Sequence, residues 1–325
     1  MKHRVHLIGD TTMHESVTHF FGYDGCLALE NGAGTRVVLS PLAGGRVLEY
    51  SLHGVNAMYL NSAQKGWRHR PGVPSVDPCG GRCDVGPEWT IPPHPDLWLG
   101  DWNGEIVGVG KARLTSVRDR VTGLRLVREF TLSSDSSRLV CEQRMINESD
   151  KPAGCCHWSR TLAAGGGLVL IPLTPGSRFP KRYIMYGPGP VMNYQPVDPN
   201  IRIREGFLEI LGTPQRPKLG MDSAAGWFSY LMRSGLLFTK RYRVEPERVY
   251  GEMAGLTVSI WYFKAEMCEL EPIGPRETLA PGASASFVEE WSLAPHRYPA
   301  AGETVDLKVL PKLAGEFVKS SAQFA

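Results

Sequence analysis

The chain has 325 residues, 42% of them hydrophobic, and its 36 basic and 33 acidic residues give a formal net charge of +3. This length accommodates one large all-β domain or two ordinary domains. No basic block dominates the nearly balanced charge, which argues against a nucleic acid as the partner.

No targeting signal stands out in the sequence. Residues 1–6 lead into no apolar segment, so we expect no signal peptide. No run approaches the roughly 20 apolar residues of a membrane-spanning helix, so we expect no membrane partner. The 7 cysteines are an odd number without a regular framework, and Cys79/Cys83 and Cys155/Cys156 are the close pairs. These features predict a soluble, reduced, cytoplasmic protein, and they leave the oligomeric state open.

Strand signals run along most of the chain. Residues 46–52 alternate with the period of a β-strand. Residues 112–117 and 124–132 are predicted to form a hairpin that turns through Gly123. The tail, 310–325, is the one helix candidate. Further strands are predicted at 36–39, 138–146, 155–162, 168–173, 207–211, 226–233, 236–242, 256–263 and 285–293.

Short strands between Gly and Pro turns favour a sandwich over an α/β fold. No linker separates them. We therefore predict a single domain, 1–325, that is all-β and mostly antiparallel with few helices. Its core covers about 25–295, and residues 296–325 form a C-terminal extension.

Two long segments, 64–104 and 172–217, interrupt the strand signals. Both are rich in proline, glycine and aromatic residues. Long irregular segments in a compact domain are usually binding loops, lids or disordered regions. The aromatic content argues against disorder, so we predict binding loops or lids.

Residues 80–95 combine charged and aromatic side chains with four prolines, which lower the entropy cost of holding polar groups in one geometry. Arg82 can donate two hydrogen bonds to vicinal hydroxyls or to a carboxylate. Trp89 offers a stacking face, and Glu88 and His94 add polar groups. The segment is therefore a candidate binding loop. The alternative is a rigid structural loop whose arginine and aspartate satisfy each other.

A second candidate segment runs from Gly154 to Thr161. On a strand, His157 shares one face with Ser159 and Thr161, while Arg160 points to the other face. His157 is the best-placed imidazole for acid–base chemistry, because its pKa of about 6.5 lies near neutrality. The alternative is a core histidine with a satisfied hydrogen bond.

A pair of carboxylates near the C-terminal end is the third candidate. Glu269 and Glu271 are two residues apart, so on a strand both face the same side. Two acids on one face suit general acid–base chemistry if that face lines a cleft. The alternative is a solvated edge strand.

A metal is a further alternative for the loop that contains residues 80–95. Cys79 and Cys83 have a C-x3-C spacing, but the second half of a structural zinc site is missing. His69, Asp84 and His94 could ligate a catalytic metal, yet no HExxH or comparable spacing occurs. GxSxG, P-loop and GxGxxG motifs are missing as well. We therefore predict no cofactor, with a divalent metal as the open alternative.

Several segments, taken in order, resemble the galactose-mutarotase-like superfamily, and most of all its bacterial aldose 1-epimerase-like branch. The resemblance covers roughly residues 25–295. It implies a β-supersandwich with a sugar-binding cleft on its concave face. The similar segments are 37–46 with 54–56, 80–81 with 86–89 and 92–93, 128–132, 147–149, 157–161, 226–227, and 269–275 with 279–282.

The resemblance also implies roles for residues. His157 falls where the acid is expected, and either Glu269 or Glu271 falls where the base is expected. Together they would open and re-close a hexose hemiacetal. The chain departs from the true enzymes around its histidine, where it has Cys156-His157-Trp158 in place of Asn-His-Thr. Implied substrate-binding residues are Arg46, Arg82, Glu88, Trp89, His94 and Arg160.

We therefore predict a carbohydrate-active protein, an aldose 1-epimerase-like isomerase with a small-molecule carbohydrate as its partner. Two alternatives remain open: a lyase or hydrolase acting on an acidic or modified sugar, and a sugar-binding protein without turnover. The leading prediction requires that Arg82, Glu88, Trp89 and His157 line one cleft.

Overall fold

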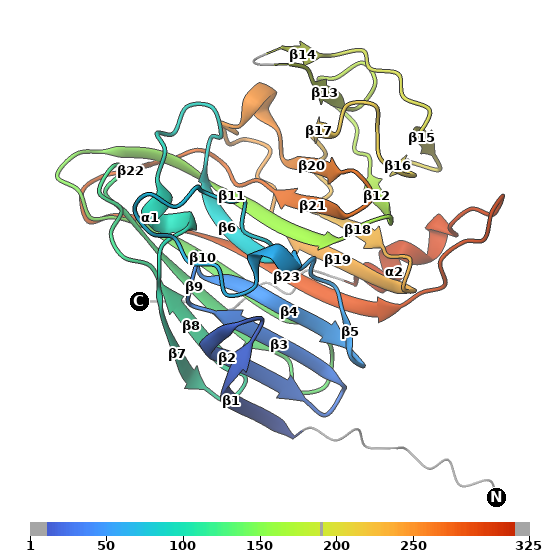
Figure 1. Ribbon diagram of the computed structural model, residues 1–325. Helices are drawn as coiled ribbons and strands as arrows, with labels where there is room; N and C mark the ends of the chain where they lie inside the picture. Colours follow the sequence, from blue (N-terminus) through green and yellow to red (C-terminus); the bar gives the residue numbers. More distant parts are fainter. Residues whose placement is uncertain (1–11, 189–190, 316–325) are drawn as a thin grey trace, which may run out of the picture.

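The computed structural model describes residues 12–188 and 191–315. Two antiparallel sheets pack face to face, and the few helices are short, so the predicted all-β fold is confirmed (Figure 1). The predicted N-terminal segment 1–6, and the part of the predicted helix beyond residue 315, lie outside the described residues. Among the described residues, no helix has the length and apolar character needed to cross a membrane.

The larger sheet runs from β1 at the bottom of Figure 1 to β14 at the top. Two further short strands pair with it, β5 (Val55–Asn56) with β4 and β22 (Glu277–Leu279) with β11. Its strand order is β1 (Met13–Phe20), β2 (Tyr23–Asn31), β3 (Thr35–Ser40), β4 (Arg46–Leu52), β6 (Gly81–Gly86), β11 (Ala153–Ala164), β21 (Met267–Pro272), β20 (Val258–Phe263), β17 (Lys218–Met221), β13 (Ile184–Tyr186) and β14 (Met192–Asn193).

The smaller sheet lies against the larger one and runs from β7 at the left of Figure 1 to β15 at the right. Its strand order is β15 (Ile201–Arg204), β16 (Phe207–Ile210), β12 (Leu168–Pro172), β18 (Trp227–Leu231), β19 (Leu236–Tyr242), β23 (Ser284–Pro295), β10 (Leu139–Asn147), β9 (Leu124–Leu132), β8 (Lys111–Thr115) and β7 (Asn103–Gly108).

The hydrophobic core fills the space between the sheets. Tyr50 of the larger sheet packs against Phe238 and Trp291 of the smaller sheet, with ring centroids 5.6 and 5.8 Å apart. Alternate residues of each strand point into this core, as the period of a β-strand requires. Each fully buried large apolar side chain stabilises the fold by about 1.5–3 kcal/mol.

A short helical segment closes the described chain. It consists of η3 (Leu307–Val309) and α2 (Leu310–Ala314), so the described helix is much shorter than the predicted one. Leu307 and Leu310 belong to a separate buried cluster with Leu168 and Leu237, on the face of the smaller sheet that points away from the core. The other helical turns are η1 (Ser62–Gln64), α1 (Pro95–Trp98) and η2 (Met253–Gly255).

The strands predicted at 124–132 and 236–242 coincide with β9 and β19. The interpretation of residues 80–86 as part of a loop is wrong, because β6 is a central strand between β4 and β11. Its charged residues hid the strand signal. They alternate with apolar ones, but they point to a buried polar site rather than to solvent.

Candidate functional site

Strand β11 separates two polar regions by the alternation of its side chains. Trp158 and Arg160 project from the outer face of the larger sheet, which points away from the smaller sheet. His157 projects from the inner face toward Glu289 of β23. In the pairing of β11 with β6, Arg160 lies directly opposite Arg82, so the outer side chains of the two strands lie next to each other. We call the outer group the carboxylate site; its residues are Asp77, Arg82, Asp84, Glu88, Trp158, Arg160, Lys218, Glu269 and Glu271.

Glu269 and Glu271 of β21 form the centre of the carboxylate site. Arg160 donates from Nε to Glu269 Oε1 at 2.8 Å, and Trp158 donates from Nε1 to Glu271 Oε2 at 2.7 Å. Both glutamates are fully buried, and β21 lies between β11 and β20, so the alternative of a solvated edge strand is wrong. The expectation that the two carboxylates share a face is confirmed.

The second oxygen of each glutamate is free. Glu269 Oε2 and Glu271 Oε1 are buried and accept no hydrogen bond from a donor in the described residues. Burial raises the pKa of Glu271 well above its usual range; the charge of Lys218 opposes this, while the charge of Glu269 and a hydrogen bond with it add to the rise. The raised pKa makes Glu271 a carboxyl group that can hold a proton.

Three cations surround the pair, and each is already matched by an acid. Lys218 Nζ lies 2.5 Å from Glu88 Oε2 and 3.9 Å from Glu271 Oε2. Arg82 donates to Asp77 at 2.5 Å. Burial opposes the charge of Lys218, but Glu271 and Glu88 outweigh it and raise the pKa of Lys218. Each cation thus has a carboxylate partner, and the site carries no unmatched positive charge.

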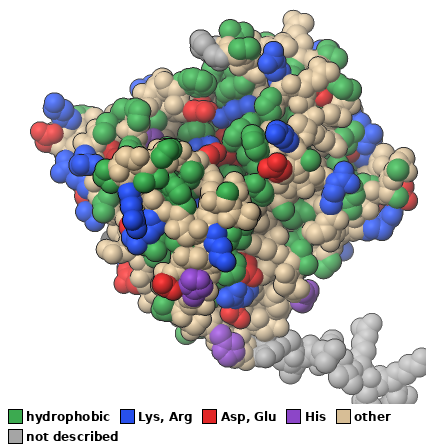
Figure 2. All heavy atoms as spheres, in the orientation of Figure 1, with side chains coloured by type: hydrophobic (Ala, Val, Ile, Leu, Met, Phe, Trp, Pro, Cys, Tyr) green, Lys and Arg blue, Asp and Glu red, His purple; other side chains and the backbone are tan. Residues whose placement is uncertain are grey.

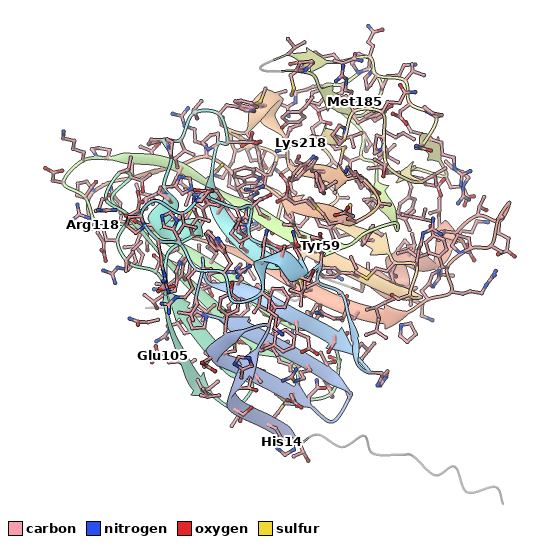
Figure 3. All side chains as sticks on the ribbon, in the orientation of Figure 1. His14, Tyr59, Glu105, Arg118, Met185 and Lys218 are labelled. Carbon is pink, nitrogen blue, oxygen red and sulfur yellow. The ribbon has the colours of Figure 1, made fainter. Side chains whose placement is uncertain are left out.

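Aromatic rings flank these cations. Arg160 stacks over the Trp158 ring at 4.7 Å, and Arg82 lies 5.4 Å from the Trp98 ring. Lys218 Nζ lies 5.2 Å from the rings of both Trp158 and Tyr186. Figure 3 labels Lys218, which comes from β17 between the centre of the sheet and the upper strands. Such contacts hold a cation in place without consuming its hydrogen bonds.

His94 belongs to the margin of the carboxylate site. Its Nε2 lies 2.5 Å from Asp84 Oδ1, and its Nδ1 lies 2.8 Å from the carbonyl oxygen of Pro92. Both partners only accept hydrogen bonds, so both ring nitrogens donate and the ring is an imidazolium. Burial alone would lower the pKa of His94, but Asp84 outweighs it and raises the pKa. His94 therefore orders the loop that follows β6.

The carboxylate site is covered by long polar side chains. The side chains of Arg160, Lys218 and Glu88 are 14%, 16% and 29% exposed, whereas those of Glu269 and Glu271 are fully buried. Figure 2 shows acidic and basic side chains recessed among hydrophobic ones near the upper centre of this face. A ligand reaches the glutamates only when the covering side chains move aside.

The structure does not place His157 in this site. His157 is 1% exposed, and its Nε2 lies 2.9 Å from Glu289 Oε1 inside the sandwich. The expectation that His157 and Glu88 line one cleft is wrong, because an odd-numbered position on β11 faces the core. The alternative of a core histidine with a satisfied hydrogen bond describes its position.

Two predicted binding residues also lie apart from the glutamates. Arg46 is fully buried and donates to the Tyr23 hydroxyl and the Cys79 carbonyl, so it anchors the loop before β6. Trp89 is 54% exposed, and no described contact joins it to the carboxylate site. By contrast, Arg82, Glu88 and Arg160 do lie in the site.

Sequence reasoning did not single out Asp77, Trp158 and Lys218 of the carboxylate site, nor Tyr186 and Glu252 beside it. Glu252 accepts the backbone N–H of Glu88 at 2.8 Å, and burial raises its pKa. These residues come from loops and strands far apart in the chain. The prediction that the segments 64–104 and 172–217 are binding loops or lids pointed toward Asp77 and Tyr186, which lie within them, but not toward Lys218 or Glu252.

Comparisons with known proteins agree with this architecture. No family model matches the chain, and no curated protein is significantly similar to it. A protein of Synechocystis, Slr1438, superposes with a TM-score of 0.59 at 14% identity, covering 86% of this chain and 99% of that one. A galactose mutarotase-like protein of Lactobacillus casei gives 0.54 at 13% identity, with 83% and 100% covered. A candidate aldose 1-epimerase of Escherichia coli K12 gives 0.53 at 12% identity, with 87% and 99% covered.

The chain has the galactose mutarotase-like fold. The expected resemblance is thus confirmed for the architecture, since every one of these likenesses spans most of both chains. At such low identity the likeness shows the fold alone, and the chemistry has to come from the carboxylate site itself.

Proposed function

We propose that the chain is a carbohydrate-active protein of the aldose 1-epimerase type, which interconverts the two anomers of an aldose sugar. The observation that carries the proposal is the buried pair Glu269–Glu271: the pKa of Glu271 is raised, and each carboxyl group has one oxygen that no donor from another residue reaches. The fold it shares with mutarotase-like structures supports a sugar as the ligand.

The two glutamates divide the acid and base roles. Glu269, held by Arg160, takes the proton of the anomeric hydroxyl at its free Oε2. The bond between the anomeric carbon and the ring oxygen breaks, and Glu271 gives its proton to that ring oxygen. Rotation of the open aldehyde and the reverse steps on its other face yield the second anomer. In these reverse steps Glu271 takes the proton back from the hydroxyl that re-closes the ring, and Glu269 returns its proton to the carbonyl oxygen, so both carboxyl groups recover their starting state.

This assignment replaces the histidine acid expected from the sequence. His157 faces the core, and both ring nitrogens of His94 already donate, so Glu271 is the group whose raised pKa suits proton donation. The remaining polar groups bind sugar hydroxyls, and the Trp158 ring supports the cationic side chains beside them.

The balance of charge favours a neutral sugar over an acidic one. Each of Arg82, Arg160 and Lys218 is matched by a carboxylate, so none is left to meet an acidic group of the substrate. All seven cysteines, which lie in the described part of the chain, are buried free thiols. That state suits a reducing compartment such as the cytoplasm.

The test is anomer interconversion, followed by NMR or polarimetry on a panel of freshly dissolved neutral and acidic aldoses. We expect Glu271→Gln to lower kcat/KM by roughly 100-fold or more, because it removes the acid of the proton-transfer step. Glu209→Gln is the matched control, since Glu209 is a fully buried glutamate that also pairs with an arginine, Arg202, in the smaller sheet. Full turnover in Glu271→Gln would contradict the assignment.

The side chains of Arg160, Lys218 and Glu88 cover the two glutamates, and this covering favours a second candidate, a sugar-binding protein without turnover. Calorimetry on the same panel separates the two, because ligand binding releases heat whether or not anomers interconvert. Binding with interconversion at the spontaneous rate would establish this second candidate.

A further inference from the structure

A second polar group, which we call the inner cluster, lies between the sheets on the opposite face of the same strands. It consists of Cys83 of β6, His157 of β11, Lys240 of β19 and Glu289 of β23, all buried. Ligand atoms of Cys83, His157 and Glu289 all lie within 4.8 Å of one another. Charged groups so deep in a hydrophobic core require mutual compensation.

Glu289 fixes the ring of His157. Its Oε1 lies 2.9 Å from His157 Nε2, and its Oε2 accepts from Trp291 Nε1 at 2.9 Å and faces Lys240 Nζ at 3.0 Å. The remaining ring nitrogen, Nδ1, is buried and has no hydrogen-bond partner of ordinary geometry among the described residues. The Cys83 thiol interacts with the same ring, so the three side chains form a cysteine–histidine–carboxylate order.

The charges around the thiol favour its ionised form. Lys240 and Arg128 are two fixed cations in this interior, while Glu289 is one anion. Burial alone would raise the pKa of the Cys83 thiol, but Arg128 and His157 outweigh it and lower the pKa. A thiolate at Cys83 reduces the excess of positive charge left by Lys240, Arg128 and a protonated His157, whereas a divalent metal ion there would add to it.

We propose that Cys83 is a reactive thiolate, positioned by His157 and Glu289, which hydrogen peroxide or a peroxide of similar size oxidises to a sulfenic acid. The thiolate sulfur attacks one peroxide oxygen, so an S–O bond forms and the O–O bond breaks. The sulfur loses two electrons and the peroxide gains them. The His157 imidazolium gives its proton to the departing hydroxide, which leaves as water. This proposal does not depend on the sugar chemistry of the outer face.

Cys141 provides a matched control within the same chain. It lies on the inner face of the smaller sheet and is 4% exposed, as Cys83 is. Burial raises the pKa of Cys141 well above its usual range, with Arg128 as an opposing charge. The two thiols are thus equally hidden and differ in their ionisation.

The experiment treats the native full-length protein with dilute hydrogen peroxide, traps sulfenic acid with dimedone, and measures each cysteine by peptide mass spectrometry. We expect Cys83 to be labelled at least about tenfold faster than Cys141. At a pH below both pKa values, a difference of one unit between the pKa values of two thiols changes the ratio of their thiolate fractions about tenfold. Equal labelling of the two, or no labelling of Cys83, would overturn the proposal.

Variants sharpen the result. Cys83→Ser should abolish the rapid label, and His157→Gln should slow labelling of Cys83 about tenfold while Cys141 keeps its rate. The comparison of Cys83 with Cys141 in the unaltered chain remains decisive if His157→Gln does not fold. Stoichiometric zinc in the purified protein, released only by denaturation, would make Cys83 a metal ligand and would also overturn the proposal.

Discussion

The two faces of β6 and β11 hold charged groups in opposite ways. On the outer face, the carboxylate site mixes fully buried acids with partly exposed cations, and two carboxylate oxygens remain free. On the inner face, Lys240 and Glu289 are buried between the sheets and pair with each other. The outer face therefore has hydrogen-bond acceptors left for a ligand, while the ion pair on the inner face stabilises the sandwich next to the Cys83 thiol.

The largest expected contrast comes from removing one cation from each face. Lys240 donates to Ser159, Thr161 and the carbonyl of Leu270, and it pairs with Glu289. Lys240→Met should lower the free energy of unfolding by about 3–5 kcal/mol, because it removes the lysine partner of the buried Glu289 and leaves three buried oxygens without their donor.

Lys218→Met is the comparison on the outer face, and chemical denaturation measures both variants. We expect a loss of about 1 kcal/mol or less for Lys218→Met, since that side chain is partly exposed and its acids can take up protons. The double variant Lys240→Met with Glu289→Gln should recover part of the unfolding free energy that Lys240→Met alone loses. Equal losses for the two single lysine variants would erase the distinction between the faces.

A pH dependence should expose the ion pair at the margin of the outer face. The pKa of His94 is raised in the folded protein by Asp84, which outweighs burial. Its contribution to stability is therefore complete below about pH 6.5, the unfolded value, and is lost as the pH rises through the folded value. The free energy of unfolding should fall across that window by at most about 1.4 kcal/mol per pH unit from this one proton.

His94→Gln isolates this effect in denaturation curves collected at several pH values. His157 also has a raised pKa, but it is present in both proteins and cancels in the difference. The variant should show a shallower decline than the unaltered chain. If the free energy of unfolding fell with pH at the same rate in both proteins, Asp84 would not raise the pKa of His94.

The smallest effects concern two tryptophans. Trp158→Phe keeps a ring beside Arg160 but removes the Nε1 hydrogen bond to Glu271, so we expect a loss of about 1 kcal/mol in unfolding free energy. Trp89→Ala should change stability by no more than about 0.5 kcal/mol and leave sugar binding intact. Thermal unfolding with calorimetric titration checks both. If Trp89→Ala lost sugar binding, Trp89 would have to be counted among the residues that bind the sugar.

The sequence was informative where a local period decides the outcome. The alternation of His157, Ser159 and Thr161 against Arg160 predicts two faces of one strand, and the structure confirms that division. The spacing of Glu269 and Glu271 likewise predicts a shared face. A period of two, however, does not say which face meets the second sheet, and so His157 was expected on the wrong side.

Residues brought together by distant strand pairing lay beyond the sequence argument. Lys218 reaches Glu88 across 130 positions of the chain, and Trp158 reaches Glu271 across 113. Such contacts depend on the strand order of the larger sheet, which no local pattern encodes. Strand β6 was missed for a related reason, since its charged residues are explained only by partners from other segments.

Strand β11 also restricts how the chain can assemble. A slip of one residue in its pairing would turn Arg160 into the hydrophobic interior and His157 into the carboxylate site. Arg160 would then lose Glu269 and Asp77, and Glu289 would lose its imidazole partner. Misregistered pairing is thus penalised on both sides of the sheet at once. The polar groups of the two faces act together as a check on alignment during folding.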